Sequence, residues 1–193
     1  MTNEILNFRK NALLANLCKE WDIMWMSCKD DKEKLIRLAL MQQSIPYVMT
    51  FCNDGRGVSK EYVLNEFRNE INDKQHLNCD DIDGDYLYSL HITNDNVNLT
   101  SDISAFMWCD DILVNVKATK CPVLYVGCGS TIHLSCEGYN SCRIYMFDTS
   151  KVYVDYLDEQ SDLLVYKYSQ TCEVIHDNFC FGKVTTHLKK LRI

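Results

Sequence analysis

Proline and glycine are scarce in this chain, with 2 Pro and 7 Gly among 193 residues. The sequence also has no low-complexity run, so a long disordered segment is not expected. No stretch reaches the roughly 18 consecutive apolar residues of a membrane span. The first residues, Met1–Glu4, lack the basic start and apolar run of a signal peptide. These absences predict a cytoplasmic protein without a membrane segment.

Cysteine, by contrast, is abundant, with 11 residues scattered through apolar segments. An odd number of cysteines without a secretion signal favours reduced thiols over a disulfide framework. Free cysteine packs as a small hydrophobic residue, so these side chains are expected to fill interior positions.

Basic residues, which a nucleic-acid-binding protein needs to contact phosphates, are few in the middle of the chain. Residues 78–182 carry 5 Lys and Arg against 16 Asp and Glu, a net charge of −11. Residues 1–77 balance 11 basic with 11 acidic residues, and residues 183–193 carry 4 basic residues and no acid. An acidic body repels phosphates, so we do not expect direct binding to DNA or RNA. We expect a basic protein as the partner instead.

From Ile103 onward, a triplet of the form apolar-x-apolar recurs every 8 to 12 residues. The eight triplets begin at Ile103, Val114, Leu124, Ile132, Ile144, Val152, Leu163 and Cys172. Alternate side chains of a strand point to one face, so each triplet predicts a short strand with two residues inward and the middle one outward. Regular repetition of such strands predicts a β-solenoid with about 20 residues per two-strand coil.

The first part of the chain instead has the three- and four-residue apolar spacing of helices. It predicts about four helices: one along Leu14–Cys28, one opened by Asp30 and Glu33, one from Pro46 through Phe51, and one from Ser59 to about Ile71. The predicted fold is therefore α+β, with a helical module over residues 1–78 and a β-solenoid with a roughly ten-residue strand repeat over residues 79–193. Open solenoid ends need covering, and the helical module and the basic tail, Lys183 to Ile193, are expected to cover one each.

The helical segment resembles a module found in uncharacterised proteins of gut Bacteroidetes and their phages. The resemblance is carried by the following residues: Trp21, Cys28, Lys32, Leu35, Ala39-Leu40, Ile45-Pro46-Tyr47, Gly55, Gly57-Val58-Ser59, Tyr62, Phe67 and Ile71-Asn72. In that group the module often precedes a short-rung β repeat, as it does here. The resemblance implies this architecture and a phage or mobile-element context. It implies no activity and assigns no functional residue.

One constellation of residues has the composition of a metal site. Cys121, Cys128, His133 and Cys136, followed by Cys142, offer the ligands that zinc prefers. The spacing lacks a CxxC pair, and His133 is the middle residue of its triplet, so packed thiols are favoured and no cofactor is expected. A metal-binding protein, or a thiol-dependent enzyme pairing Cys128 with His133 or His176, remains the alternative function.

The leading hypothesis is a non-enzymatic protein-binding or assembly module that acts on a basic host protein. Its expected binding residues are tyrosines at outward strand positions and the acids near them: Tyr125, Tyr145, Tyr153, with Tyr166 or Tyr168, and Asp148, Asp155 and Asp158. Tyrosine forms contacts with little loss of entropy, which suits a binding surface. The other interpretation is that stacked tyrosines only stabilise the solenoid. Self-association is also compatible with this class of protein.

Overall fold

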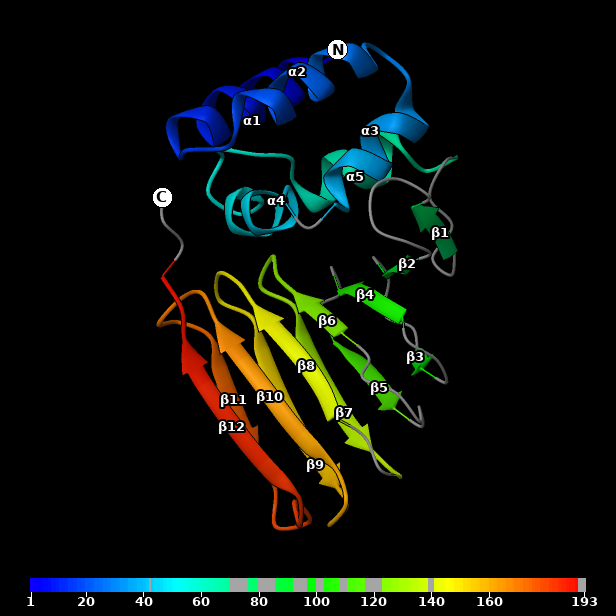
Figure 1. Cartoon of the computed structure of the whole chain (residues 1–193), viewed down its shortest axis with the longest axis vertical. Coiled ribbons are helices and arrows are strands. Elements are labelled where there is room, and N and C mark those ends of the chain that lie inside the picture. Colours follow the sequence, from blue (N-terminus) through cyan, green and yellow to red (C-terminus); the bar gives the residue numbers. More distant parts are fainter. Residues whose placement is uncertain are drawn as a thin grey trace. The chain divides into compact units, whose positions relative to one another are not determined.

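The computed structural model describes residues 1–41, 43–69, 76–79, 86–91, 97–99, 103–107, 111–116, 123–138 and 141–190 (Figure 1). Between residues 76 and 107 the description covers the backbone and, of the side chains, Asn98. The chain divides into two compact units, one spanning Met1–Asn72 and the other Asp73–Lys190. The division therefore falls six residues before the expected boundary between residues 78 and 79.

The first unit contains five helices. They are α1 (Asn3–Leu14), α2 (Lys19–Cys28), α3 (Lys32–Ala39), α4 (Ile45–Phe51) and α5 (Lys60–Glu66). The single helix predicted along Leu14–Cys28 is wrong. Asn16 adopts a left-handed φ of 68°, which ends α1 and separates it from α2. The stripe of apolar residues runs from the end of α1 through α2, and its spacing alone does not reveal the turn between the two helices.

The other helix predictions are confirmed in position, with shifted ends. Asp31, one residue after the expected Asp30, caps α3 by accepting a hydrogen bond from the Lys34 N–H at 3.1 Å. Ser59 caps α5 in the same way, and Pro46 lies in the first turn of α4. None of the described helices is both long and apolar enough to cross a membrane.

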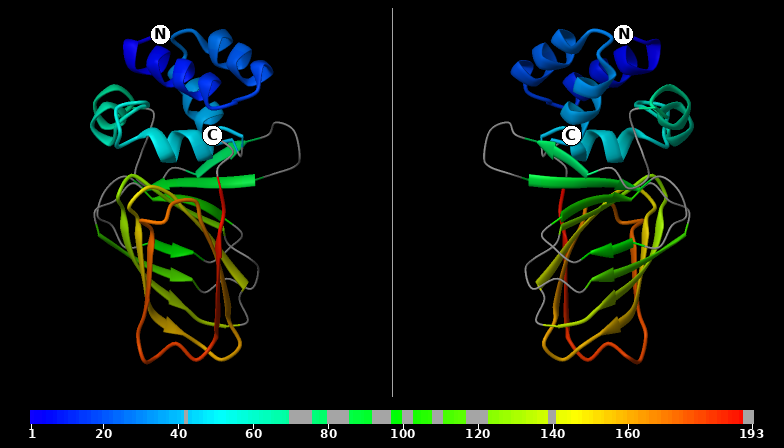
Figure 2. Two further views of the ribbon diagram at one scale, coloured as in Figure 1. Left: turned by 90° about the vertical axis from the view of Figure 1, so that its left-hand side faces the viewer. Right: turned by 90° about the vertical axis from the view of Figure 1, so that its right-hand side faces the viewer.

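The second unit is a β-solenoid in which, from its second strand onward, successive strands alternate between two sheets (Figures 1 and 2). Sheet A has the order β1-β2-β4-β6-β8-β10-β12 and sheet B the order β11-β9-β7-β5-β3. The strands are β1 (His76–Cys79), β2 (Tyr86–His91), β3 (Val97–Leu99), β4 (Ile103–Met107), β5 (Ile112–Val116), β6 (Val123–Val126), β7 (Thr131–Cys136), β8 (Ser141–Met146), β9 (Lys151–Leu157), β10 (Asp162–Lys167), β11 (Glu173–His176) and β12 (Lys183–Leu188). Among the strands that the structure describes, β1 alone pairs antiparallel with its neighbour.

The register shows a coil of about 20 residues, as the triplets predict. Val123 pairs with Arg143, and Ile112 pairs with Ile132, each twenty residues apart. From β4 onward the paired residues lie 19 to 22 positions apart. The α+β fold class with a C-terminal solenoid is therefore confirmed.

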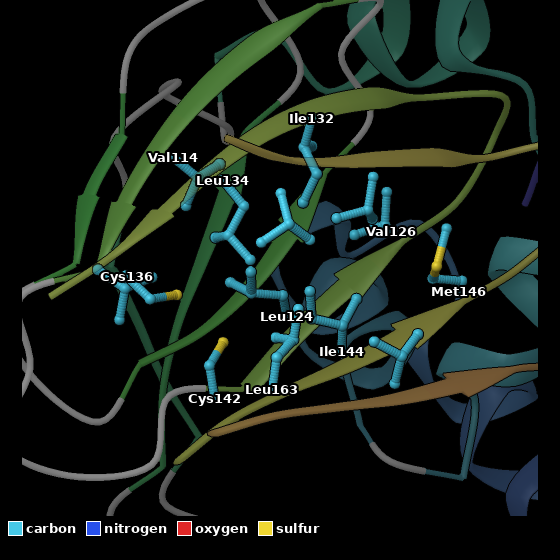
Figure 3. Close-up of a cluster of buried hydrophobic side chains, with 14 of the residues drawn as sticks. Val114, Leu124, Val126, Ile132, Leu134, Cys136, Cys142, Ile144, Met146 and Leu163 are labelled. Atoms are coloured by element: carbon cyan, nitrogen blue, oxygen red, sulfur yellow. The ribbon is translucent and has the colours of Figure 1, made fainter. Parts of the chain in front are cut away.

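The core lies between the two sheets and is built from the first and third residues of the triplets. Figure 3 shows inward side chains of both sheets meeting there, among them Val114, Leu124, Ile132, Ile144 and Leu163. These five are at most 3% exposed, whereas the middle residues of the triplets on β5, β7, β8, β9 and β10 are half-buried on the outside. Alternating burial of this kind identifies the two sheets' outer faces as opposite surfaces of the solenoid.

The basic tail does not have the capping role predicted for it. Its first residues, Lys183–Leu188, form β12, which pairs in parallel with β10 and continues sheet A. In this pairing, Val184 points inward and packs against the solenoid core, which stabilises β12 in the sheet. The tail thus extends the solenoid by one strand.

Candidate functional site

The six residues predicted to bind a partner do not form one surface. Tyr125 and Tyr145 lie on β6 and β8, on the outer face of sheet A. Tyr153 and Asp155 lie on β9, in sheet B on the opposite side of the core. The remaining two, Asp148 and Asp158, lie in the turns that follow β8 and β9. Each group therefore has to be considered by itself.

The tyrosines of sheet A stack on one another along the sheet. We call Tyr125, Tyr145, Tyr166 and His187 the tyrosine ladder; its successive ring centroids are 5.1, 5.0 and 5.5 Å apart. Stacking leaves Tyr125 only 9% exposed, so the expectation of an outward Tyr125 available to a partner is not met. Burial also raises the pKa of the Tyr145 phenol. The ladder fits the interpretation that stacked tyrosines stabilise neighbouring coils.

Asp148 and Asp158 have structural roles in turns. Asp148 adopts a left-handed φ of 56°, which aspartate tolerates better than most residues. The carboxylate of Asp158 accepts hydrogen bonds from the backbone N–H groups of Gly138, in the turn after β7, and of Gln160, in the turn after β9. It therefore links equivalent turns of two neighbouring coils. Burial acts to raise the pKa of Asp158, but hydrogen bonds from Ser161, Gly138 and Gln160 outweigh it and hold the pKa below its ordinary value.

The outer face of sheet B brings together a compact polar group. We call Asp111, His133, Tyr153 and Asp155 the His133 cluster. The Nδ1 atom of His133 lies 3.0 Å from an Asp155 carboxylate oxygen, and its Nε2 atom lies 3.7 Å from Asp111 Oδ1. The imidazole also stacks on the Tyr153 ring at 4.7 Å, with only 5° between the ring planes. The histidine is therefore held by contacts at both nitrogens and on one ring face.

A β-bulge gives Asp155 its position in this cluster. The β7–β9 register pairs Leu134 with Val154 and then Ser135 with Tyr156, which leaves Asp155 as the extra residue. An extra residue bends its strand and redirects its side chain. The carboxylate of Asp155 consequently reaches the imidazole one strand away.

Asp111 and the His133–Tyr153 stack were missed as a site by the sequence reasoning. The signal was present, because His133 and Tyr153 are the middle residues of triplets one coil apart. Aligning the triplets on a 20-residue coil, instead of reading each strand by itself, would have placed these two rings side by side.

The outer side of sheet B also carries an excess of acidic residues. Asp111, Asp155, Glu173 and Asp177 lie on or beside its strands, and Lys151 is the lysine on its described strands β5, β7, β9 and β11. Lys151 forms an ion pair with Glu173 at 3.2 Å. This side of the solenoid therefore presents net negative charge around the His133 cluster.

The alternative metal ligands do not converge in the described part of the chain. His133 points outward from β7, whereas Cys136 on the same strand is fully buried in the core. Cys128 lies in the turn before β7, and Cys121 lies outside the described residues. Among the residues that the structure describes, no three His, Cys, Asp or Glu side chains are arranged to hold a metal ion.

Of the cysteine side chains that the structure describes, six are free thiols and two are disulfide-bonded. The free thiols are Cys18, Cys28, Cys136, Cys142, Cys172 and Cys180. Cys52 and Cys128 are disulfide-bonded, which contradicts the expectation of reduced thiols at these two positions and argues against Cys128 as a nucleophile. Burial raises the pKa of Cys172, so this thiol is also unsuited to act as one.

The helical unit has an apolar surface of its own. An open groove of about 420 Å³ is lined by residues of α1 and by Asp22 of α2. Leu14 is 75% exposed at its edge, and Arg9 pairs with Asp22 at 2.8 Å. This groove is a second surface at which a partner could bind.

Comparisons with protein-family models, with curated proteins and with solved structures gave no match. The class of the protein therefore follows from its fold: an α+β protein whose second unit is a two-sheet parallel β-solenoid.

Proposed function

We propose that the protein is a non-enzymatic binding or assembly module that binds a basic protein through the outer face of sheet B. The observation that carries the proposal is the His133 cluster, an ordered group of aromatic and acidic side chains on the outside of the solenoid. Ordered side chains lose little entropy on binding, which is the property that favours aromatic anchors in protein interfaces.

The contacts of His133 support binding rather than catalysis. A general base needs a ring nitrogen that can approach a substrate proton. Both nitrogens of His133 face carboxylates, and Tyr153 covers one face of the ring. The cysteine of the same strand, Cys136, points into the core and cannot act with this histidine as a nucleophile.

The charge of this face supports a basic partner. The cluster itself contains Asp111 and Asp155, and Asp177 directly follows β11 of the same sheet. Residues 78–182 together carry a net charge of −11. Complementary charge steers two proteins toward each other and raises their association rate. Tyr153 supplies the aromatic contact, and the tyrosine ladder on sheet A serves stability instead.

The biological setting of the proposal is a phage or mobile-element accessory protein in the cytoplasm. It rests on the resemblance of the helical segment to modules of gut Bacteroidetes and their phages. An acidic face that imitates the charge of a nucleic acid would block a host protein that handles DNA or RNA. The resemblance to that group is an analogy and supports this setting alone. The site supports only the expectation that the partner is positively charged.

Charge reversal on sheet B tests the proposal. Affinity capture from a native host lysate at low salt should recover a basic protein with the wild type and not with the double variant Asp111→Lys and Asp155→Lys. The captured protein should also be released as salt rises, because exposed charges are screened beyond about 10 Å at 0.1 M salt. Thermal melting of both variants should show that the fold survives.

A matched variant on the other side of the solenoid serves as the control. Asp162 lies exposed on β10 in sheet A and Glu159 in the turn before it. Reversing these two charges changes the net charge equally and should leave capture intact. If both double variants bind as well as the wild type, sheet B is not the binding face, and the groove between α1 and α2 becomes the surface to test.

A further inference from the structure

The last coil in the described part of the solenoid is formed by β11 and β12. Each is the last described strand of its sheet, β11 beside β9 and β12 beside β10. Val174 and Val184 point inward from these strands and are only partly buried, whereas Val152 and Val165 in the preceding coil are 0% exposed. An exposed strand edge is a surface onto which another chain can add a strand.

Exposed apolar side chains collect at this end. Within the described part of the solenoid, the exposed large hydrophobic residues all belong to the last coil: Ile175 at 38%, Phe179 at 59%, Phe181 at 58% and Leu188 at 56%. Single exposed apolar residues are ordinary, but a group of four on one coil indicates a surface that another protein covers.

The backbone of this coil has hydrogen-bonding groups that face outward. In a parallel ladder, alternate residues direct their N–H and C=O groups to opposite neighbours. The Lys189 N–H donates to the Lys167 carbonyl of sheet A, so Val184, Thr186 and Leu188 direct their groups to the free edge. On β11, the N–H groups of Glu173 and Asp177 donate toward β9, so Val174 and His176 face the free edge.

The two free edges carry opposite charge. On β12, Lys183 and His187 lie on the outer face, in register with Asp162 and Tyr166, and Lys189 follows. On β11, Glu173 lies on the outer face in register with Lys151, and Asp177 follows two residues after Ile175. Two β12 edges would therefore repel each other, and a β12 edge would attract a β11 edge.

An antiparallel pairing of β12 with β11 of another copy satisfies all of these features together. Opposing Thr185 to Ile175 places Lys183 opposite Asp177 and His187 opposite Glu173 on the outer face. In the same register the edge-facing groups of Val184 oppose those of His176, and those of Thr186 oppose those of Val174. The alternation of the hydrogen-bonding groups and the pattern of charges are thus both satisfied in this one register.

We infer that the last coil is an interface between two copies of this chain, joined end to end through two equal β12–β11 pairings. A two-fold axis along the strand direction brings sheet A of one copy against sheet B of the other at both pairings. Such an isologous contact uses the same surface twice and closes at the dimer, so it covers both exposed edges without forming a fibre. Phe179, Phe181 and Leu188 then lie at the margins of the interface.

Charge swapping tests the pairing in the full-length protein. Sedimentation equilibrium over a wide concentration range should give a dimer for the wild type. Lys183→Glu and Asp177→Lys should each raise the dimer dissociation constant by roughly tenfold or more, because each change affects two symmetry-related ion pairs. The double variant, which restores opposite charges across the interface, should recover the dimer. Lys10→Glu in the helical unit is the control and should dimerise like the wild type.

A proline variant tests the edge without changing charge. Thr186→Pro removes an N–H that faces away from β10, so it should abolish the dimer and leave circular dichroism and melting of the monomer unchanged. A wild type that stays monomeric at every concentration would overturn the inference. So would a dimer that persists in Thr186→Pro, or a charge swap that fails to restore association, since the latter would indicate pairing between like strands.

Discussion

The Asp155 carboxylate lies 3.0 Å from the Nδ1 atom of His133, which is 22 positions earlier in the chain. The contact exists because one coil brings β9 beside β7 and a bulge makes Asp155 the extra residue of its strand. Immediately beside it, Val154 and Leu134 point the opposite way into the core, at 1% and 0% exposure. Adjacent residues of the same strands thus belong to the outer face of sheet B and to the core.

This alternation predicts opposite tolerance to substitution at neighbouring positions. Val154→Asp should lower the free energy of unfolding by several kcal/mol, because it buries a carboxylate without a partner. Tyr153→Ser should cost only about 1 kcal/mol, since it removes a half-exposed ring stacked on His133. Urea denaturation of the three proteins measures both effects. Equal losses would contradict the register of β9.

The turn contacts of Asp158 predict a pH-dependent contribution to stability. Its pKa is lower in the folded protein than in the unfolded chain, so its stabilising contribution is present above about pH 4 and is lost as the pH falls through the folded value. Asp158→Ala should cost roughly 1–2 kcal/mol at neutral pH through the lost hydrogen bonds. The difference from the wild type should shrink in acid. Asp162→Ala, at an exposed position, is the control, and an equal loss there would contradict the assignment.

The burial of the free thiols predicts which of them react. Cys18 is exposed, whereas Cys136, Cys142 and Cys172 are at most 1% exposed. Iodoacetamide labelling followed by peptide mass analysis should therefore modify Cys18 in the folded protein and the three buried residues only after denaturant is added. Fast labelling of Cys136 in the native state would show that the core of the solenoid is open there.

Metal removal should leave the protein unchanged. His133 and Cys136 point to opposite sides of β7, so they cannot bind one ion together. We expect the melting temperature to be the same with and without a chelator, and elemental analysis to find well under one zinc per chain. A stoichiometric metal that disappears in Cys136→Ser would instead revive the metal-binding alternative.

Late ionisation is expected for Tyr145 of the tyrosine ladder and for Tyr168, whose ring stacks against that of Tyr145. Burial raises the pKa of both Tyr145 and Tyr168 in the folded protein. The unfolded chain therefore loses these protons first, so their contribution to stability is present below about pH 10 and declines as the pH rises through the folded values. Burial also raises the pKa of Tyr47 and Tyr62. An absorbance titration at alkaline pH should therefore show a late component that is smaller in the double variant Tyr145→Phe and Tyr168→Phe than in the wild type. A titration unchanged by both substitutions would mean that other tyrosines ionise last.

The sequence by itself determined the class of fold and the inward residues of the solenoid. Both depend on local periodicity: a change from helical spacing to alternation separates the two units, and alternation assigns Val114, Ile144 and Val152 to the core before any pairing is known. Helix caps at Ser59 and near Asp31 could also be predicted, because a cap bonds within its own first turn.

Only the tertiary structure decided which outward residues meet. Neighbours in a solenoid sheet lie two strands apart in sequence, so the coil length determines that Tyr125 stacks on Tyr145 and that His133 stacks on Tyr153. The sequence pattern grouped these tyrosines as one surface because it does not say which sheet each strand joins. The left-handed residue Asn16, the bulge at Asp155 and the pairing of Lys183–Leu188 with β10 likewise depend on packing against distant residues, which periodicity along the chain cannot encode.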